Sequence, residues 1–408
     1  MLDVVIIGAG PSGLTAADEL SKIGYRVAIV DQMPSPARKF LLAGRGGLNL
    51  THSENVATFL GRYREAEPFL APIIEAFSPQ DLIDWCHNLG QQTFVGSSGR
   101  VFPKSMKASP LLRAWLRRLD DQGVELLTRR SFCGLADDGT ALVKSGDDDP
   151  APFPARSVLL ALGGASWPKL GSDAAWVDPM RMRGVTVNEF QPSNCGFLVP
   201  WSDVLKDRFS GHPLKGIQLS IGSRSVIGEA IVSVRGLEGG AVYALSADIR
   251  EAINQAGKAD VSIDLRPSLS SDDLIAKLSR PRGKQSMATF LKKTLKFKPV
   301  EHALVREASP LPNSPEELAA RIKSLTVTSN APYPIDRAIS SAGGIALTEV
   351  TDNLMLKNIP GVFVAGEMLD WEAPTGGYLL QACFATARCA AKGIATYLET
   401  KNTGENLG

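Results

Sequence analysis

The N-terminus holds the feature that most constrains the fold, a strand, helix and strand joined by a glycine-rich turn. Residues 3–32 read DVVIIGAGPSGLTAADELSKIGYRVAIVDQ. The β-branched run at residues 4–7 predicts a strand buried on both faces, as in a parallel sheet. It leads directly into a GxGxxG turn and an amphipathic helical segment, and a second apolar strand ends at Asp31. We therefore expect a complete βαβ unit within a Rossmann-like α/β fold.

The spacing of this turn indicates a bound dinucleotide. Gly8 permits the tight turn, Gly10 lets the backbone approach a pyrophosphate at the helix N-terminus, and Gly13 allows close helix packing. Asp31 can accept a ribose hydroxyl, and an acid at this position favours FAD or NAD over NADP. The residues predicted to bind the cofactor here are Gly8, Gly10, Pro11, Ser12, Gly13, Asp31 and Gln32.

A second pair of glycine and acid, near the C-terminus, separates FAD from NAD. The strand predicted over residues 362–365 ends at Gly366 and Glu367, and a loop leads through Gly376 and Gly377 into a long helix. Glu367 can bind the ribityl or pyrophosphate side of a flavin. The positive end of the helix can face the flavin pyrimidine carbonyl, where negative charge accumulates on reduction. Taken alone, this pattern could also come from a simple strand, turn and capped helix without a ligand. Together with the N-terminal unit, the pattern predicts FAD.

Composition restricts the class of protein and its partners. The chain has 408 residues, 44% of them apolar, which is enough for two or three soluble domains. The formal charge of +1 and the lack of a basic run with interleaved aromatics give no reason to expect nucleic acid. Five scattered cysteines suggest neither a disulfide framework nor a metal site and fit a reducing cytoplasm. No stretch approaches the roughly 20 apolar residues of a membrane span, and no leader is recognisable.

Four segments together resemble the BaiN-like family of NAD(P)- and FAD-dependent oxidoreductases. Besides the N-terminal unit, they are KFLLAGRGGLNLTHSE, LLALGGASWPKLGSDAAW and the closing GGIALTEVT…PGVFVAGEMLDWEAPTGGYLLQA. The resemblance spans essentially the whole chain. It implies a glutathione-reductase-type FAD domain that is split in sequence by a large insert.

The resemblance places the glycine-rich stretch after Lys39 beside the isoalloxazine ring. The family reads close to SGGGRCN there; in this chain Arg45 and Gly47 stand in the reverse order, and Leu48 replaces a frequent cysteine, which excludes thiol chemistry at that position. Backbone without a Cβ can lie flat against a planar ring. A solvated loop cation is the alternative for Arg45. The residues predicted to lie at the ring are Gly44, Arg45, Gly46, Gly47 and Asn49 on one side and Gly376, Gly377, Tyr378 and Leu379 on the other.

Four further residues are expected to contact the cofactor. Arg38 and Lys39 are placed to reach the phosphates or the AMP ribose, and the family comparison puts a backbone contact with adenine near Phe132. A buried strand ends at Gly163, similar to the third dinucleotide-contacting segment of these flavoproteins; a core strand with a tight turn is the alternative.

The middle of the chain changes character. Short alternating segments at residues 217–221, 229–234 and 261–265 indicate an antiparallel sheet, and SSDDLIAKLSR and SPEELAARIKSL begin with helix-capping signals. The basic amphipathic stretch KQSMATFLKKTLKFK could touch a membrane surface, although a solvated helix face is the more common outcome. We expect residues 1–187 and 335–408 to form the FAD domain, and 188–334 an inserted domain that contributes most of a substrate pocket.

The expected reaction follows from what accompanies the flavin site. The sequence contains no second βαβ unit with GxGxxG and no CxxC, so NADH or NADPH would visit the flavin directly as a transient reductant. The resemblance implies reduction of an activated C=C bond in an apolar small-molecule substrate. Tyr378, His52 and Arg45 are the candidates for catalysis, and a helix-cap or surface role is the simpler interpretation for His52. A flavin-dependent dehydrogenase or oxidase of amines or hydroxy acids, and a non-enzymatic redox sensor, remain alternatives. The oligomeric state is not indicated.

Overall fold

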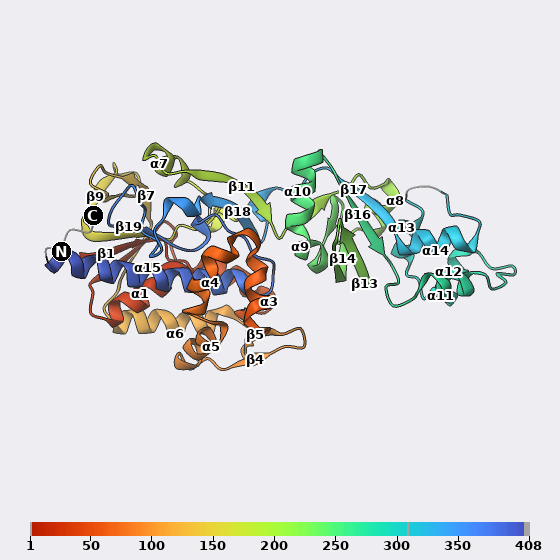
Figure 1. The fold of residues 1–408 in the computed structure, drawn as a ribbon, viewed down its shortest axis with the longest axis horizontal. Helices are drawn as coiled ribbons and strands as arrows, with labels where there is room; N and C mark the ends of the chain where they lie inside the picture. Colours follow the sequence, from red (N-terminus) through yellow and green to blue (C-terminus); the bar gives the residue numbers. More distant parts are fainter. Residues whose placement is uncertain (1, 308–309, 404–408) are drawn as a thin grey trace. The chain divides into compact units, whose positions relative to one another are not determined.

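The chain folds into two compact units. The structure, a computed structural model, describes residues 2–307 and 310–403, apart from the side chain of Arg45. The segments up to Gln191 and from Ser340 form one unit, here called the split unit, and Pro192–Ile339 form the other, here called the insert (Figure 1).

A five-stranded parallel sheet forms the centre of the split unit. Every pair of neighbouring strands is parallel. Residues 4–7 of the central strand are buried on both faces, as the β-branched run predicts. In spatial order the strands are β19 (Val362–Val364), β10 (Ala155–Leu160), β1 (Leu2–Ile7), β2 (Val27–Asp31) and β6 (Glu125–Thr128).

Two helices from opposite ends of the chain pack side by side on this sheet. α1 (Pro11–Lys22) follows the glycine turn after β1, and α15 (Tyr378–Thr403) lies along it (Figure 1). The two segments thus share one hydrophobic core. This confirms the predicted fold class, a Rossmann-like α/β domain whose halves are separated in sequence.

Smaller elements complete the split unit. Two three-stranded antiparallel sheets, β3–β5–β4 and β7–β8–β9, and the two-stranded sheet β11–β18 add to it. The bounds are α2 (Arg38–Ala43), η1 (Gly44–Gly46), β3 (Thr51–His52), α3 (Val56–Leu60), η2 (Gly61–Ala66), α4 (Glu67–Glu75), α5 (Pro79–Asn88), β4 (Thr93–Val95), β5 (Arg100–Pro103), α6 (Ala108–Asp121), β7 (Arg130–Leu135), β8 (Ala141–Ser145), β9 (Ala151–Phe153), η3 (Pro168–Leu170), α7 (Val177–Met182), β11 (Val187–Ser193), β18 (Ser340–Ile345), η5 (Leu347–Glu349) and η6 (Gly366–Met368).

The insert is an antiparallel sheet with helices, as its alternating segments and capping signals predict. Its six strands run in the order β12 (Phe197–Leu198), β15 (Gly236–Glu238), β14 (Arg224–Val232), β13 (His212–Ile221), β16 (Ala259–Asp264) and β17 (Leu325–Ser329), and it has a hydrophobic core of its own. Ser270 and Ser314 cap α11 and α14 by accepting backbone N–H groups. The helices are α8 (Asp203–Phe209), α9 (Gly240–Ala244), α10 (Ser246–Ala256), α11 (Ser271–Leu278), α12 (Met287–Leu295), α13 (Pro299–Val305), α14 (Pro315–Lys323) and η4 (Ile335–Arg337).

The described residues contain neither a membrane-spanning helix nor a cluster of metal-ligating side chains. Within residues 2–307 and 310–403, no helix is both long and apolar enough to cross a membrane. In the same described ranges, no three His, Cys, Asp or Glu side chains gather as a metal ion would require.

Candidate cofactor site

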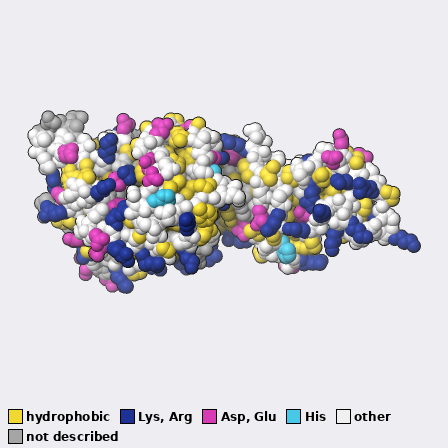
Figure 2. All heavy atoms as spheres, turned by 90° about the horizontal axis from the view of Figure 1, so that it is seen from below, with side chains coloured by type: hydrophobic (Ala, Val, Ile, Leu, Met, Phe, Trp, Pro, Cys, Tyr) yellow, Lys and Arg dark blue, Asp and Glu magenta, His cyan; other side chains and the backbone are white. Residues whose placement is uncertain are grey.

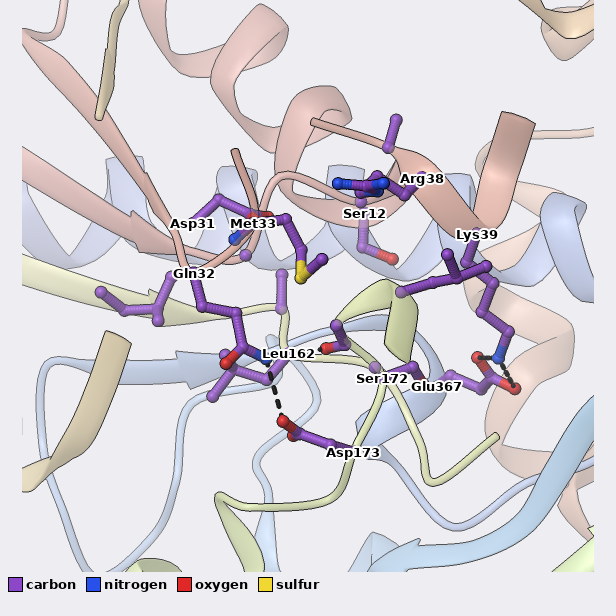
Figure 3. A pocket seen from close by; sticks show the side chains of 18 of the residues that line it. Ser12, Asp31, Gln32, Met33, Arg38, Lys39, Leu162, Ser172, Asp173 and Glu367 are labelled. Atoms are coloured by element: carbon purple, nitrogen blue, oxygen red, sulfur yellow. Dashed lines mark hydrogen bonds and ion pairs between the residues drawn. The ribbon is translucent and has the colours of Figure 1, made fainter. Parts of the chain in front are cut away.

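A cavity opens at the carboxyl ends of the parallel strands in the split unit. It is lined by the loops after β1, β2, β10 and β19 together with α2 and β7. Open α/β sheets bind their ligands at this edge. We call this cavity the cradle (Figure 3). The predicted residues that line it are Gly8, Gly10, Pro11, Ser12, Asp31, Gln32, Arg38, Lys39, Phe132, Gly163 and Glu367.

The three glycines of the first turn have different roles. A Cβ on Gly8 would lie 2.3 Å from the Ala161 carbonyl oxygen, and one on Gly13 would lie 1.9 Å from the Gly8 carbonyl oxygen. These two glycines therefore allow backbone segments to pack. No heavy atom of the described chain lies within 4 Å of a Cβ built on Gly10, which lines the cradle. The space beside Gly10 is therefore available to a ligand.

The acid at the end of β2 is held in place by main-chain donors. The N–H groups of Ala9 and Met33 each donate to the Asp31 carboxylate at 2.7 Å. Burial raises the pKa of Asp31, although these two hydrogen bonds oppose that shift. A carboxylate has about four acceptor positions, so Asp31 keeps capacity for a ribose hydroxyl. Beside it, the Gln32 amide donates to Asp173 at 3.1 Å, across the mouth of the cradle (Figure 3).

The two cations predicted to bind the phosphates, Lys39 and Arg38, differ in whether they already form an ion pair within the protein. The Lys39 ammonium donates to both Glu367 oxygens, at 2.8 and 3.1 Å, and to the Ser166 hydroxyl at 2.7 Å (Figure 3). Glu367 is buried, so this ion pair joins the N-terminal and C-terminal segments at the cradle wall. Arg38 also lines the cradle and has no ion-pair partner among the described residues. Of these two cations, Arg38 is therefore the one available to a phosphate.

Other predicted residues support the cradle from behind. The Ser12 hydroxyl donates to the Cys383 carbonyl oxygen of α15 at 3.1 Å, and a Cβ on Gly366 would lie 2.2 Å from that hydroxyl oxygen. Gly163 has a φ of +71°, and its carbonyl oxygen accepts the Trp176 indole N–H at 2.9 Å. These contacts fix the turns after β1, β10 and β19 relative to one another.

The second set of predicted glycines lies apart from the cradle lining. A Cβ on Gly377, at a φ of +94°, would lie 2.5 Å from the Thr51 backbone. The main chain before α15 therefore packs directly against the main chain of β3. Cβ atoms on Gly44 and Gly47 would press on Ala108 and Met106, each at 2.7 Å, whereas the exposed Gly46 has open space among the described atoms. Gly376 precedes Gly377, and Leu379 packs against the hydrophobic core.

Buried polar atoms without hydrogen-bond partners in the described structure lie both at the cradle and beside the second set of glycines. The Ser172 hydroxyl lines the cradle, and the Asn49 amide oxygen and the Thr51 hydroxyl lie beside the second set of glycines. All three atoms are buried and accept or donate no hydrogen bond within the described structure. Buried polar groups in proteins are nearly always satisfied, so each of them points to a missing ligand or water. Together with the space at Gly10 and the unpaired Arg38, these atoms are the kind of hydrogen-bonding partners that the phosphates, ribityl chain and ring edge of FAD require.

Tyr378 anchors the N-terminus of α15 to the loop after β3. Its hydroxyl donates to Glu54 at 2.6 Å, and Arg62 donates to the same carboxylate at 2.7 and 3.1 Å. Burial and the Glu54 carboxylate raise the pKa of Tyr378, which is therefore neutral at physiological pH. Burial opposes ionisation of Glu54, but the hydrogen bonds from Arg62 and Tyr378 leave its pKa lowered.

Both ring nitrogens of His52 are already in use. Nε2 donates to the Ser98 carbonyl oxygen at 2.9 Å, and Nδ1 accepts the Glu54 N–H at 3.2 Å, which defines a neutral tautomer. The ring stacks on Tyr378 with centroids 5.5 Å apart. The side chain of Arg45, the third catalytic candidate, lies outside the described part of the structure.

Several residues of these two places were not identified from the sequence. Ser172 and Asp173 lie in LGSDAAW, and Glu54 ends KFLLAGRGGLNLTHSE, so the quoted motifs held a signal for them. Arg62 and Ser341, whose N–H donates to Glu367 at 3.3 Å, lie in no motif.

The parallel sheet with a dinucleotide turn and a split second half defines a glutathione-reductase-type FAD domain, the fold of FAD-dependent oxidoreductases. The chain belongs to the family described as HI0933-like protein Rossmann domain, whose model matches residues 2–393. The predicted resemblance to BaiN-like flavoenzymes is thereby confirmed.

Comparison with known proteins gives relatives along the whole chain. The 3-dehydro-bile acid delta(4,6)-reductase of Clostridium scindens is 26% identical, over 96% of this chain and 98% of that protein. The ribosomal RNA dihydrouridine synthase of Haemophilus influenzae is 23% identical over the same shares. Among solved structures, a flavocytochrome c3 fumarate reductase in its open conformation aligns with 97% of this chain and 78% of its own, at a TM-score of 0.54 and 15% identity. The last likeness shows the fold.

Proposed function

We propose that the protein reduces an activated C=C bond of a small, apolar substrate, with FAD as cofactor and NADH or NADPH as transient reductant. The observation that carries the proposal is the cradle, which combines open space at Gly10, a fixed ribose acceptor at Asp31 and an unpaired Arg38. The relative from Clostridium scindens, which aligns over nearly its whole length, is named as a delta(4,6)-reductase and supports this reaction class. The cytoplasm maintains both reductants and is the compartment that we assign.

The residues of the cradle would hold the cofactor as follows. The first N–H groups of α1, which have no partner inside the helix, and Arg38 would bind the pyrophosphate. Asp31 would accept a ribose hydroxyl, and Glu367, neutralised by Lys39, would lie toward the ribityl chain. When bound, FAD supplies hydride transfer.

Reduction of a C=C bond also needs a proton, and we assign its delivery to Tyr378. Its raised pKa keeps the hydroxyl protonated, and Glu54 with Arg62 fixes the position of that hydroxyl. In this structure that O–H is donated to Glu54, so it would have to turn to the substrate; His52 is the alternative donor, and its Nε2–H is likewise donated, to the Ser98 carbonyl oxygen. Leu48, at the position of the frequent family cysteine, is wholly buried and has no proton to give.

An anaerobic mixing experiment tests the proposal. The FAD-loaded protein is mixed with NADH or NADPH, and the flavin absorption band is followed. We expect the band to bleach with one of them and to recover on addition of a steroid 4-en-3-one. Bleaching by an amine or a hydroxy acid without nicotinamide would instead establish a dehydrogenase or oxidase. A flavin that neither nicotinamide bleaches would favour the redox sensor.

A second candidate substrate is a uridine in RNA. The relative from Haemophilus influenzae is named as a ribosomal RNA dihydrouridine synthase, and dihydrouridine differs from uridine by two hydrogens across one C=C bond. The reduction is thus of the same chemical class. The observation in this chain that favours RNA is charge: residues 192–339 contain 20 Lys and Arg but only 15 Asp and Glu.

A further inference from the structure

The helical part of the insert has a cationic surface that no acid of the described structure pairs with. Residues 280–298 contain seven Lys and Arg and no Asp or Glu. All seven side chains are exposed, and none forms an ion pair with another residue of the described structure. They are Arg280, Arg282, Lys284, Lys292, Lys293, Lys296 and Lys298, here called the basic surface.

Acidic groups in the core beneath are already paired with other cations. Arg266 forms an ion pair with the buried Glu301 at 2.8 Å, and Lys323 does so with Asp264. These pairs are internal to the fold. The seven cations therefore add positive charge without serving the packing of the insert.

The geometry of α12 separates its folding face from its charged face. Phe290, Leu291 and Leu295 are buried in the core of the insert, whereas Lys292 and Lys293 in the last turn, and the C-cap residue Lys296, lie exposed. The remaining cations lie in the connection from α11 and at the start of α13. Figure 2 shows one face of the molecule, on which Lys and Arg side chains are exposed in both units.

We infer that the basic surface binds the phosphate backbone of RNA. A run of exposed cations on consecutive elements matches a chain of closely spaced phosphates, and release of condensed counterions drives such binding. The choice of RNA among polyanions rests on the second candidate substrate proposed above. Phosphate contacts position a nucleic acid without reading its sequence, so this surface would hold the RNA while other residues select the base.

The observations oppose a lipid membrane as the partner. An interfacial helix buries its apolar face in the lipid, but the apolar face of α12 is inside the insert. In addition, no large hydrophobic side chain between residues 270 and 306 of the described structure is exposed. The surface offers charge alone.

The test measures binding of the full-length protein to a fluorescent RNA of about 20 nucleotides by anisotropy over a range of KCl concentrations. The variant combines Lys292→Ala and Lys293→Ala, both helix-compatible, with Lys296→Ala at the left-handed C-cap of α12, and its melting temperature is compared with that of the wild type. Each lost phosphate contact lowers the slope of log K against log salt by about 0.7, so three should lower it by about 2. That corresponds to about 100-fold weaker binding at about 0.1 M salt, if the affinity extrapolated to 1 M is unchanged.

The matched control removes the same charge elsewhere. Lys22, Lys392 and Lys401 are exposed on α1 and α15 of the split unit, and their combined replacement by alanine should change the affinity by less than about threefold. An equal loss in both variants would overturn the inference, as would a wild type that binds no RNA. Stronger binding to vesicles of phosphatidylcholine and phosphatidylserine, or to double-stranded DNA, would also overturn the assignment to RNA.

The measurement uses no nicotinamide and no turnover. Intact RNA binding with no reduction by NADH or NADPH would refute the proposed reaction alone. Intact reduction without RNA binding would refute the basic surface alone.

Discussion

Replacing Gly10 with valine should abolish FAD binding and leave folding intact. Gly10 has φ −82° and ψ −177°, which residues with a side chain adopt freely. No described atom lies within 4 Å of its built Cβ. Valine is a poorer helix N-cap than glycine, so we expect the free energy of unfolding to fall by no more than about 1 kcal/mol.

The loss of cofactor follows from the same space. The isopropyl group of valine would occupy the side of Gly10 that faces the cradle, where the pyrophosphate must approach the backbone. At an FAD concentration of about 100 times Kd, the wild type should gain about 2.7 kcal/mol of stability. The assay is thermal unfolding with and without FAD, together with the flavin absorbance that remains after desalting. For Gly10→Val we expect a melting curve that FAD does not shift, and a colourless protein.

Two further glycines serve as controls. Gly240, in the insert, also has open space at its Cβ among the described atoms, so Gly240→Val should melt like the wild type and keep its FAD shift. Gly13→Ala would place a Cβ 1.9 Å from the Gly8 carbonyl oxygen and should destabilise the apoprotein by about 1–3 kcal/mol or more. Stoichiometric FAD in Gly10→Val would refute the pyrophosphate assignment. Destabilisation as large as that of Gly13→Ala would show that the space at Gly10 is required for packing.

Three other outcomes test the second set of glycines and Tyr378. Tyr378→Phe should slow substrate reduction by about 100-fold or more while flavin reduction by NAD(P)H keeps its rate, as stopped-flow absorbance would show; equal slowing of both steps would contradict a proton-donor role. Gly46→Val, at an exposed and open position, should shift the bound flavin spectrum without changing the melting temperature, and an unchanged spectrum would place the ring elsewhere. The pKa of Glu54 is lowered on folding, so its contribution to stability is present above its ordinary 4.5 and is lost as pH falls below it; urea unfolding of Glu54→Gln should show a smaller loss in that acid range, and an identical pH profile would refute the coupling.

Local signals explain which parts could be predicted. The β-branched run, the GxGxxG spacing and the acid after β2 lie within about 30 consecutive residues, and such a unit has few alternative folds. The capping serines of α11 and α14 are equally local. By contrast, Lys39 meets Glu367 across 328 positions of the sequence, and Tyr378 meets Glu54 across 324. A motif can show that such residues are present. It cannot show that Lys39, predicted to bind a phosphate, forms an ion pair with a carboxylate far away in the sequence.

Averaging over the whole chain hid the charge of the insert. The formal charge of +1 gave no reason to expect a polyanion, yet the surplus of five cations in residues 192–339 is balanced by acids in the rest of the sequence. At physiological salt, electrostatic attraction is screened beyond about 8 Å, so a partner responds to the local surface charge and not to the net charge of the chain. Net charge is therefore informative only after the chain has been divided into its units.

Leu48, which stands where the family often has a cysteine, bears on which residue could donate a proton in this chain. Leu48 is wholly buried, and its N–H donates to the Met106 carbonyl oxygen at 3.0 Å, so this position now serves packing. A reductase still needs a proton donor. Both candidates donate their proton to another residue here, Nε2 of His52 to the Ser98 carbonyl oxygen and the Tyr378 hydroxyl to Glu54. We propose Tyr378, because Glu54 and Arg62 hold its hydroxyl in place. Under the proposed function the acid is therefore the Tyr378 hydroxyl at the start of α15, because the position of the frequent family cysteine is a buried leucine in this chain.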